Sequence, residues 1–337
     1  MTRVDLAPFT LSHVPAAAAL ATERYRVLRR GLPVLPAEHE DPGGFQGKLA
    51  PIAAAGSGFA AFTGNRFAGF LAGIRIPSFM GSGPGWYGPE WAHGVRGEDR
   101  GAILGRLYQA IAAAWVADGC INHAITLLAG EAVERDTFFQ LGFGMCTVDA
   151  VRGIDSVAGP LESDDPDAIV IRKAMPEDAA ALAELSAALR RHTASSPVFL
   201  HHPERDGEHE RREWLSLPGC EAWLAFELGC PVGFMQREPV NYGAAFVVSA
   251  PDTLAVTGAF VEEASRGRGV ARALLARIVD SARAKGARRV SVDFESANAE
   301  GWSFWLRHFR PACWSVLRRV DDRLPVPRRA LHETEPR

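Results

Sequence analysis

The sequence predicts an α/β protein in which mixed sheets are covered by helices. Segments with apolar residues at helical spacing alternate with short segments in which every second residue is apolar. With 337 residues, the chain is also too long for one average domain. Together these observations favour two α/β domains.

The C-terminal half is expected to run strand, one or two helices, hairpin, long strand, helix, strand, helix, strand. Residues 222–227 and 232–236 form the predicted hairpin around a Leu-Gly-Cys-Pro turn. A long apolar strand ends at Val261, the helix after it stops at Gly286, and residues 290–294 alternate as the next strand.

A similar pattern occurs in the N-terminal half, which we interpret as an internal duplication. The apolar helix positions that match at an offset of 167 residues are Ile103 with Val270, Leu107 with Leu274, and Ile111 with Ile278. The glycine that stops each helix matches at the same offset.

Residues 153–168 have the composition of a linker, with two prolines and a cluster of acidic residues. The expected boundaries are therefore an N-terminal domain at 1–152, the linker at 153–168, a C-terminal domain at 169–322 and a tail at 323–337.

Charge and hydropathy exclude several classes of protein. A formal net charge of −3 gives no reason to expect binding to nucleic acid or to an anionic membrane. No apolar run reaches the roughly 20 residues that span a bilayer, and the first residues lack the apolar core of a signal peptide. We expect a cytoplasmic protein.

No metal site is expected. The five cysteines are scattered without a Cys-x-x-Cys pair, so we interpret them as reduced, buried thiols. His201, His202 and His209 lie in a segment without helical metal-ligand spacing, and we expect a solvated loop there.

The most informative segment is the turn from Arg266 to Ala271. The small residues Gly269 and Ala271 would let a bulky anion approach the backbone. The amide N–H groups of the first helical turn and the helix dipole would then favour its negative charge. No Gly-Lys-Ser/Thr follows, and only two glycines are present, so a Walker loop and a complete dinucleotide fingerprint are excluded.

This turn resembles the pyrophosphate signature of the GCN5-related N-acetyltransferases (GNAT family), Gln/Arg-x-x-Gly-x-Gly/Ala. Twenty-nine residues after Gly269, Asn298 opens a segment similar to the family's second motif, Asn-x-x-Ala-x-x-x-Tyr-x-x-x-Gly-Phe. We expect a helix there, and the Asn298 side chain suits an N-cap as well as a ligand. The resemblance covers residues 169–320 well and 4–150 weakly. It implies two tandem GNAT folds, each a mixed, mostly antiparallel sheet flanked by helices.

The resemblance also implies a function: N-acetylation of a small-molecule or peptide amine by direct attack on acetyl-CoA, in the C-terminal domain and without a metal. The residues that it implies for coenzyme binding are Ala259, Phe260, Val261, Arg266, Gly267, Arg268, Gly269, Val270, Ala271 and Asn298.

Asp293 is the candidate catalytic base. In some members of the family an acidic residue five positions before the motif Asn activates the amine, and Asp293 stands five positions before Asn298. Glu295, on the same strand face, and Glu262 are reserve candidates.

The second motif departs from the family pattern at two places. Trp305 stands where a Tyr often acts as the general acid, and an indole cannot supply a proton near neutral pH. The Gly before Phe309 is absent, whereas the first half keeps Gly142 before Phe143. We interpret Trp305 as a core aromatic residue and the gap as a one-residue deletion.

The first half has lost the features that favour an anion. The residues that correspond to Arg266, Gly269 and Ala271 are Asp99, Ala102 and Leu104. They bring negative charge, less backbone freedom and bulk, so we expect no coenzyme binding there by this route. A shifted site near Gly94 or Gly97 stays open.

Trp305 and the missing glycine also favour an alternative, a non-catalytic protein that binds or senses acyl-CoA. A structural scaffold that binds no coenzyme is a third hypothesis. The sequence leaves open the acceptor, the acyl chain, the general acid and whether the two halves form a monomer.

Overall fold

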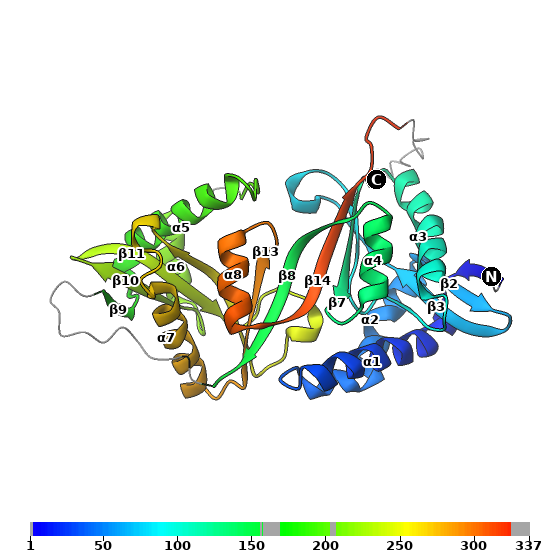
Figure 1. Ribbon diagram of the computed structural model, residues 1–337, viewed down its shortest axis with the longest axis horizontal. Helices are drawn as coiled ribbons and strands as arrows, with labels where there is room; N and C mark the ends of the chain where they lie inside the picture. The colour runs from blue at the N-terminus through cyan, green and yellow to red at the C-terminus, as the bar shows by residue number, and fades with distance from the viewer. Residues whose placement is uncertain (1–2, 156, 158–168, 203–206, 325–337) are drawn as a thin grey trace, which may run out of the picture. The chain divides into compact units, whose positions relative to one another are not determined.

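The computed structural model describes residues 3–155, 157, 169–202 and 207–324 (Figure 1). The chain folds into two compact units. Unit 1 comprises Met1–Val148, Ala245–Val247 and Ala312–Arg337, and unit 2 comprises Asp149–Ala244 and Val248–Pro311. Most of the expected linker and of the expected tail lies outside the described residues.

Unit 1 contains an antiparallel sheet in the order β1-β2-β3-β6, together with β4, β5, β7 and β14, of which β5 and β7 run parallel. Its strands are β1 (Val4–Pro8), β2 (Gly58–Thr63), β3 (Arg66–Ala72), β4 (Ile74–Ile76), β5 (Gly85–Gly88), β6 (His93–Val95), β7 (Asn122–Leu128), the first half of β8 (Gly144–Gly153) and most of β14 (Arg310–Arg319). Its α-helices are α1 (Val14–Gly31), α2 (Pro42–Ala54), α3 (Arg100–Ala117) and α4 (Ala132–Gln140).

The last strand, β14, belongs to unit 1, although we expected the C-terminal domain to extend to residue 322. β14 comes from the end of the chain but pairs antiparallel with β7, from Cys313 opposite Leu128 to Arg319 opposite Asn122. This pairing places residues from Ala312 onward in unit 1. The boundary was not predictable because β-strand pairing joins segments that are far apart in the sequence.

Unit 2 contains neighbouring strands in the order β13-β12-β11-β10-β9, in which only β12 and β13 run parallel. Its elements are β9 (Val170–Lys173), α5 (Ala179–Ala194), α6 (Glu208–Ser216), β10 (Glu221–Glu227), β11 (Cys230–Glu238), β12 (Thr253–Val261), α7 (Val270–Ala284), β13 (Arg289–Glu295) and α8 (Ala299–His308). The predicted α/β class with mixed sheets flanked by helices is confirmed, and the N-terminal region folds as a second unit.

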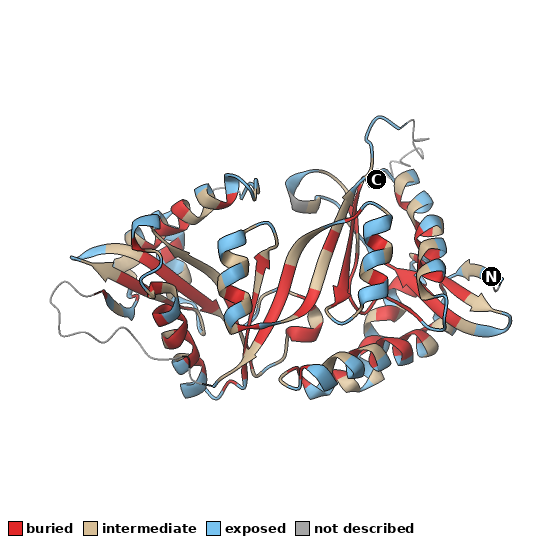
Figure 2. Cartoon of the chain, in the orientation of Figure 1, coloured by how far each residue is buried: buried red, intermediate tan, exposed pale blue. Residues whose placement is uncertain are grey.

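The helix α7 is held in unit 2 by one buried apolar face. This face includes Val270, Leu274 and Ile278, the three residues whose four-residue spacing predicted the helix, while Arg272 and Asp280 are exposed (Figure 2). Gly286, at φ 77°, follows the helix in the left-handed conformation that favours glycine. None of the helices among the described residues is long and apolar enough to cross a membrane.

The hairpin between β10 and β11 is tighter than predicted. Glu227 pairs with Cys230, so the turn consists of Leu228 and Gly229 alone. Both residues have positive φ, 51° and 81°, as a two-residue turn that matches the strand twist requires. Cys230 and Pro231, which we had assigned to the turn, belong to β11.

The ends of α4 and α8 explain the missing glycine. Gly142, at φ 85°, turns the chain back toward Phe143 after α4. After α8 the chain continues directly into Phe309, whose extended backbone (φ −125°, ψ 158°) any residue can adopt. The helix α8 therefore ends without a left-handed residue, in agreement with a one-residue deletion.

A buried cluster of charges ties α7 to β10 and β11. Arg237 is fully buried and forms an ion pair with Glu221 at 2.7 Å. Lys285 and Lys173 contact the same carboxylate at 2.7 and 3.0 Å. Burial alone would raise the pKa of Glu221, but the bonds from Lys285, Ser281 and Lys173 and the charge of Arg237 outweigh it and lower the pKa to about 2.

We therefore expect Glu221→Gln to destabilise the protein by ~3 kcal/mol at pH 7, measured by urea unfolding. Because the folded-state pKa of Glu221 is lowered, its contribution is complete above about pH 5 and disappears as the pH falls toward 2. Glu208→Gln is the control, since Glu208 forms an exposed pair with Arg212 on α6 and should cost under ~0.5 kcal/mol. Equal effects of the two substitutions would contradict this account.

Candidate functional site

Two neighbouring parallel strands of unit 2 diverge and open a space between them. Pairing of β12 with β13 runs from Thr253 opposite Arg289 to Val256 opposite Val292 and ends there. We call the region beyond that point, residues 257–261 of β12 and 293–295 of β13, the fork. On its other edge β12 stays paired with β11 as far as Val261.

A β-bulge lies where the fork begins. Gln236 pairs with Gly258 and Arg237 pairs with Val256, so Thr257 is an extra residue in β12. A bulge bends its strand and increases the local twist. We attribute the divergence of β12 from β13 to this extra residue.

The turn after β12 contains the two glycines of the sequence motif. Gly267 and Gly269 have φ angles of 75° and 84°, in the left-handed region that other residues adopt only with strain. Gly269 is the N-cap of α7, so the first amide groups of this helix begin at the turn. A Cβ on Gly267 would meet no atom within 4 Å, which leaves the backbone open to a ligand.

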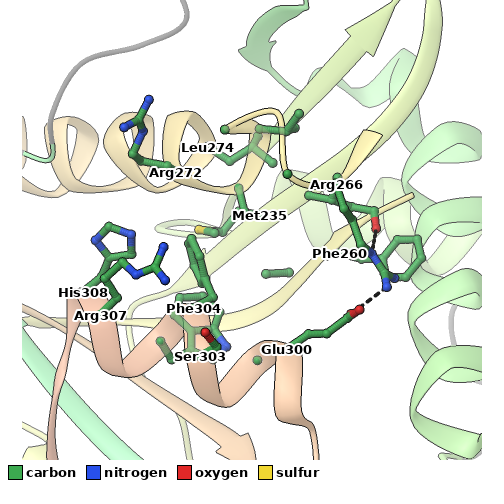
Figure 3. Close-up of a pocket in the computed structure, with 18 of the residues that line it drawn as sticks. Met235, Phe260, Arg266, Arg272, Leu274, Glu300, Ser303, Phe304, Arg307 and His308 are labelled. Carbon is green, nitrogen blue, oxygen red and sulfur yellow. Dashed lines mark hydrogen bonds and ion pairs between the residues drawn. The ribbon is translucent and has the colours of Figure 1, made fainter. Parts of the chain in front are cut away.

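A cavity of about 1250 Å³ in unit 2 contains this turn (Figure 3). All ten residues that we predicted for coenzyme binding line it: Ala259, Phe260, Val261, Arg266, Gly267, Arg268, Gly269, Val270, Ala271 and Asn298. Its walls come from β12, the turn, the first residues of α7, and α8. The fold therefore brings the two predicted motifs together, while their ligand stays a prediction.

The cavity is strongly cationic although the whole chain carries a net charge of −3. Its lining includes the arginines Arg152, Arg266, Arg268, Arg272 and Arg307, and its one carboxylate among the described residues is Glu300. Arg266 donates to Glu300 at 2.6 Å and to the carbonyl oxygen of Val261 at 3.0 Å. Such an excess of positive charge suits a ligand with several phosphates.

A second group of basic residues lies at the other end of the cavity (Figure 3). Arg272 of α7 and Arg307 and His308 of α8 gather there. Partial burial lowers the pKa of His308, and the charges of Arg152, Arg307 and Arg272 lower it further. These effects favour the neutral form of His308.

Asn298 has a structural role as the N-cap of α8, besides its predicted role in coenzyme binding. Its side-chain oxygen accepts a hydrogen bond from the backbone N–H of Gly301 at 3.0 Å and so caps α8. A Cβ on Gly301 would approach the Asn298 side chain to 3.0 Å. The same residue lines the cavity, so capping and ligand contact are compatible.

Asp293 lies in the fork but does not line the cavity. Its carboxylate is half-buried and accepts a hydrogen bond from the side-chain amide of Asn241 at 2.6 Å. Burial and the nearby charge of Glu295 raise the pKa of Asp293 to about 6 against the effect of that bond. A carboxylate with this pKa can accept a proton at neutral pH.

Trp305 occupies the place of the family's tyrosine as a buried aromatic residue. It is 7% exposed and packs edge-on against Phe309, with ring centroids 5.5 Å apart. The ring centroids of Phe304 and Trp305 lie 4.9 Å apart. This packing supports the interpretation of Trp305 as a core residue.

Several residues of the cavity were not predicted from the sequence: Arg152, His192, Met235, Arg272, Ser303, Phe304, Arg307 and His308. Helical spacing could have found two of them, because Gly301, Phe304 and His308 share one face of α8. Arg152 and Met235 lie on other strands, and no local pattern marks them.

In unit 1, the residues that correspond to Ala271 and Arg266 are a buried leucine and an exposed aspartate. Leu104 is completely buried in the core, where Ala271 of unit 2 lines a cavity. Asp99, which corresponds to Arg266 at the offset of 167 residues, is the N-cap of α3, so a carboxylate lies at this helix start, whereas the N-cap of α7 is Gly269. These features support the prediction that unit 1 does not bind coenzyme by this route.

Among the described residues, no group of three or more His, Cys, Asp or Glu side chains is arranged to hold a metal ion. His202 lies 4.0 Å from Glu295 and His209 lies 3.4 Å from Glu213, in separate pairs. Part of the histidine-containing segment, residues 203–206, lies outside the described residues.

A comparison with protein families finds a match within the C-terminal half. Residues 187–309 match the acetyltransferase (GNAT) family, which confirms the resemblance drawn from the two motifs. No curated protein matches the sequence.

Two solved structures are similar to this chain, and the first of them shows a shared fold. A GCN5-related N-acetyltransferase from Sphaerobacter thermophilus superimposes with a TM-score of 0.55 at 15% identity, over 95% of this chain and 96% of that chain. A GCN5-related N-acetyltransferase from Kribbella flavida gives a TM-score of 0.39 at 16% identity, over 95% of this chain and 71% of that chain.

We expect Gly269→Glu to weaken the binding of acetyl-CoA by at least about 100-fold, or ~2.7 kcal/mol, in a calorimetric titration. The substitution places a carboxylate at the anion-binding turn and strains a backbone with φ 84°. Gly286→Glu is the matched control, because Gly286 has φ 77° and does not line the cavity. It should suffer the same strain and bind normally, so equal losses would contradict our assignment of the turn.

Proposed function

We propose that residues 187–309, which form a domain of the acetyltransferase (GNAT) family, transfer an acetyl group from acetyl-CoA to a primary amine. Family membership supports acyl transfer in general. The acetyl donor, the amine acceptor and the position of the active site in unit 2 are our proposals.

The observation that carries the proposal is the turn with positive φ at Gly267 and Gly269 inside an arginine-lined cavity. Backbone N–H groups at a helix start, positive charge and the absence of side-chain bulk are what a diphosphate requires. The fork next to it leaves backbone groups of β12 unpaired with β13 beyond Val256, and polar groups of this kind bind an amide-containing chain well.

In this arrangement each residue has a defined task. Gly267, Gly269 and Val270 offer backbone contacts to the diphosphate, and Ala259 and Val261 offer them to the arm that carries the acetyl group. Acetyl-CoA, when bound, supplies an activated thioester carbonyl. Asp293 removes a proton from the acceptor ammonium, so that the neutral amine can attack that carbonyl.

The departing thiolate needs a proton, and Trp305 cannot provide one. In our proposal this proton comes from water or from the amine nitrogen, which must lose a second proton as the amide forms. The overall reaction then converts one ammonium and one thioester into an amide, a thiol and one released proton.

A second function, acyl-CoA binding without turnover, has one observation in its favour: the general acid of the family is replaced by a buried tryptophan. This second function predicts the same binding of acetyl-CoA as the first, but no transfer of the acetyl group. Release of free thiol from acetyl-CoA across a panel of amines distinguishes the two. Saturable binding without release on any amine would support the sensor.

We expect Asp293→Asn to lower kcat/KM by about 100-fold or more at pH 7, because an amide cannot accept the proton of the acceptor. The affinity for acetyl-CoA should be unchanged, since Asp293 does not line the cavity. Thiol release and calorimetry measure the two quantities separately. An active Asp293→Asn variant would direct attention to the reserve carboxylates Glu295 and Glu262.

The pH dependence follows from the raised pKa of Asp293. The base works only when ionised, so kcat/KM should fall about tenfold per pH unit below about pH 6 and level off above pH 7. We call this fall in kcat/KM below about pH 6 the acidic limb of the pH profile. The residual activity of Asp293→Asn should not show it. A wild-type profile that is flat between pH 5 and 7 would exclude Asp293 as the base.

A further inference from the structure

One side chain outside the cavity holds the candidate base. Asn241 lies in the connection between β11 and β12, and its Nδ2 donates a hydrogen bond to Oδ1 of Asp293 at 2.6 Å. The two residues are 52 positions apart in the chain. No motif in the sequence had marked Asn241.

The orientation of this amide is set by a second hydrogen bond. The backbone N–H of Gly243 donates to Oδ1 of Asn241 at 2.9 Å. An N–H group requires an acceptor, so the oxygen of the amide must face Gly243 and the NH₂ group must face Asp293. The reverse orientation would place two donors together at Gly243 and two oxygens together at Asp293.

Gly243 suits this local turn. A Cβ at this position would lie 3.3 Å from Oδ1 of Asn241, closer than most such contacts. The turn therefore presents the amide in one orientation before any ligand arrives, which is what positioning of a base requires.

We propose that Asn241 is a positioning residue for the base: its amide holds one carboxylate oxygen of Asp293 and leaves the other oxygen to take the proton of the acceptor amine. The inference rests on the proposed role of Asp293. It adds to the site a residue from the loop between β11 and β12.

The charges around Asp293 define what the loss of Asn241 would do. Glu295, two residues further along β13, acts on Asp293 as a like charge, and His202 lies 4.0 Å from Glu295. Burial and Glu295 both favour the protonated form of Asp293, while the Asn241 bond favours the ionised form. Without that bond, the pKa of Asp293 should therefore rise.

The test compares the pH profile of kcat/KM for wild type and Asn241→Ala, with the best amine of the panel. We expect the acidic limb to move upward by about one pH unit. Activity should then fall about five-fold at pH 6 and almost recover at pH 8. Asn241→Asp, which adds a negative charge, should move the limb further in the same direction.

The matched control is Val240→Ala, a substitution at an exposed neighbour in the same loop. It should leave the limb where it is, and all variants should bind acetyl-CoA like the wild type. A loop that Asn241 merely stabilises would lose activity evenly at every pH. An even loss, or an unchanged profile, would overturn the proposal.

A double mutant separates this inference from the proposed function. If Asp293→Asn abolishes the limb and Asn241→Ala then changes nothing further, the two residues act as one unit. If Asp293→Asn keeps full activity and the same acidic limb, Asp293 is not the base, and the proposed role of Asn241 is wrong as well. If Asp293→Asn is impaired but Asn241→Ala does not move the limb, only the present inference fails.

A measurement without turnover gives an independent readout. The carboxyl ¹³C resonance of Asp293, identified by its absence in Asp293→Asn, reports the pKa directly during a pH titration. The midpoint should be higher in Asn241→Ala than in wild type or Val240→Ala. Equal midpoints would overturn the proposal even if no amine proves to be a substrate.

Discussion

The divergence of β12 from β13 is the constraint on which the rest of unit 2 depends. Pairing ends at Val256 and Val292, next to the bulged residue Thr257. A sheet that continued to pair would leave no space before α7 and would close the edge of β12. The bulge instead leaves backbone groups of β12 unpaired with β13, and the residues beyond it, Ala259, Phe260 and Val261, line the cavity.

Two kinds of electrostatic environment lie close together in unit 2. Five arginines line the cavity, where they favour a ligand with several negative charges. Asp293 lies outside that lining, and the charge that acts on it most is Glu295. An arginine beside Asp293 would lower its pKa and make it a weaker base. The arginines are thus separated from the carboxylate, as our proposal of anion binding and proton removal in one domain requires.

The two units show how few residues decide between binding and packing. The two halves of the chain share the order strand, helix, strand, helix, strand, from β6 to β8 in the first half and from β12 to β14 in the second. In unit 2 the helix starts at Gly269 and Ala271 lines a cavity. In unit 1 the helix starts at Asp99, and Leu104, which corresponds to Ala271 at the offset of 167 residues, is buried. The common element order supports the predicted duplication.

The sequence by itself determined the fold class, the turn at Gly267 and Gly269, and the helix start at Asn298. Each of these depends on residues within one or two turns of chain: positive φ favours glycine, a side-chain oxygen caps the next helix, and apolar spacing sets the buried face. The tertiary structure alone decided which distant segments meet. It placed β14 in unit 1, brought Arg152 and Met235 into the cavity, and set Asn241 against Asp293. Strand pairing and side-chain contacts across many residues depend on the whole packed domain, and no local pattern records them.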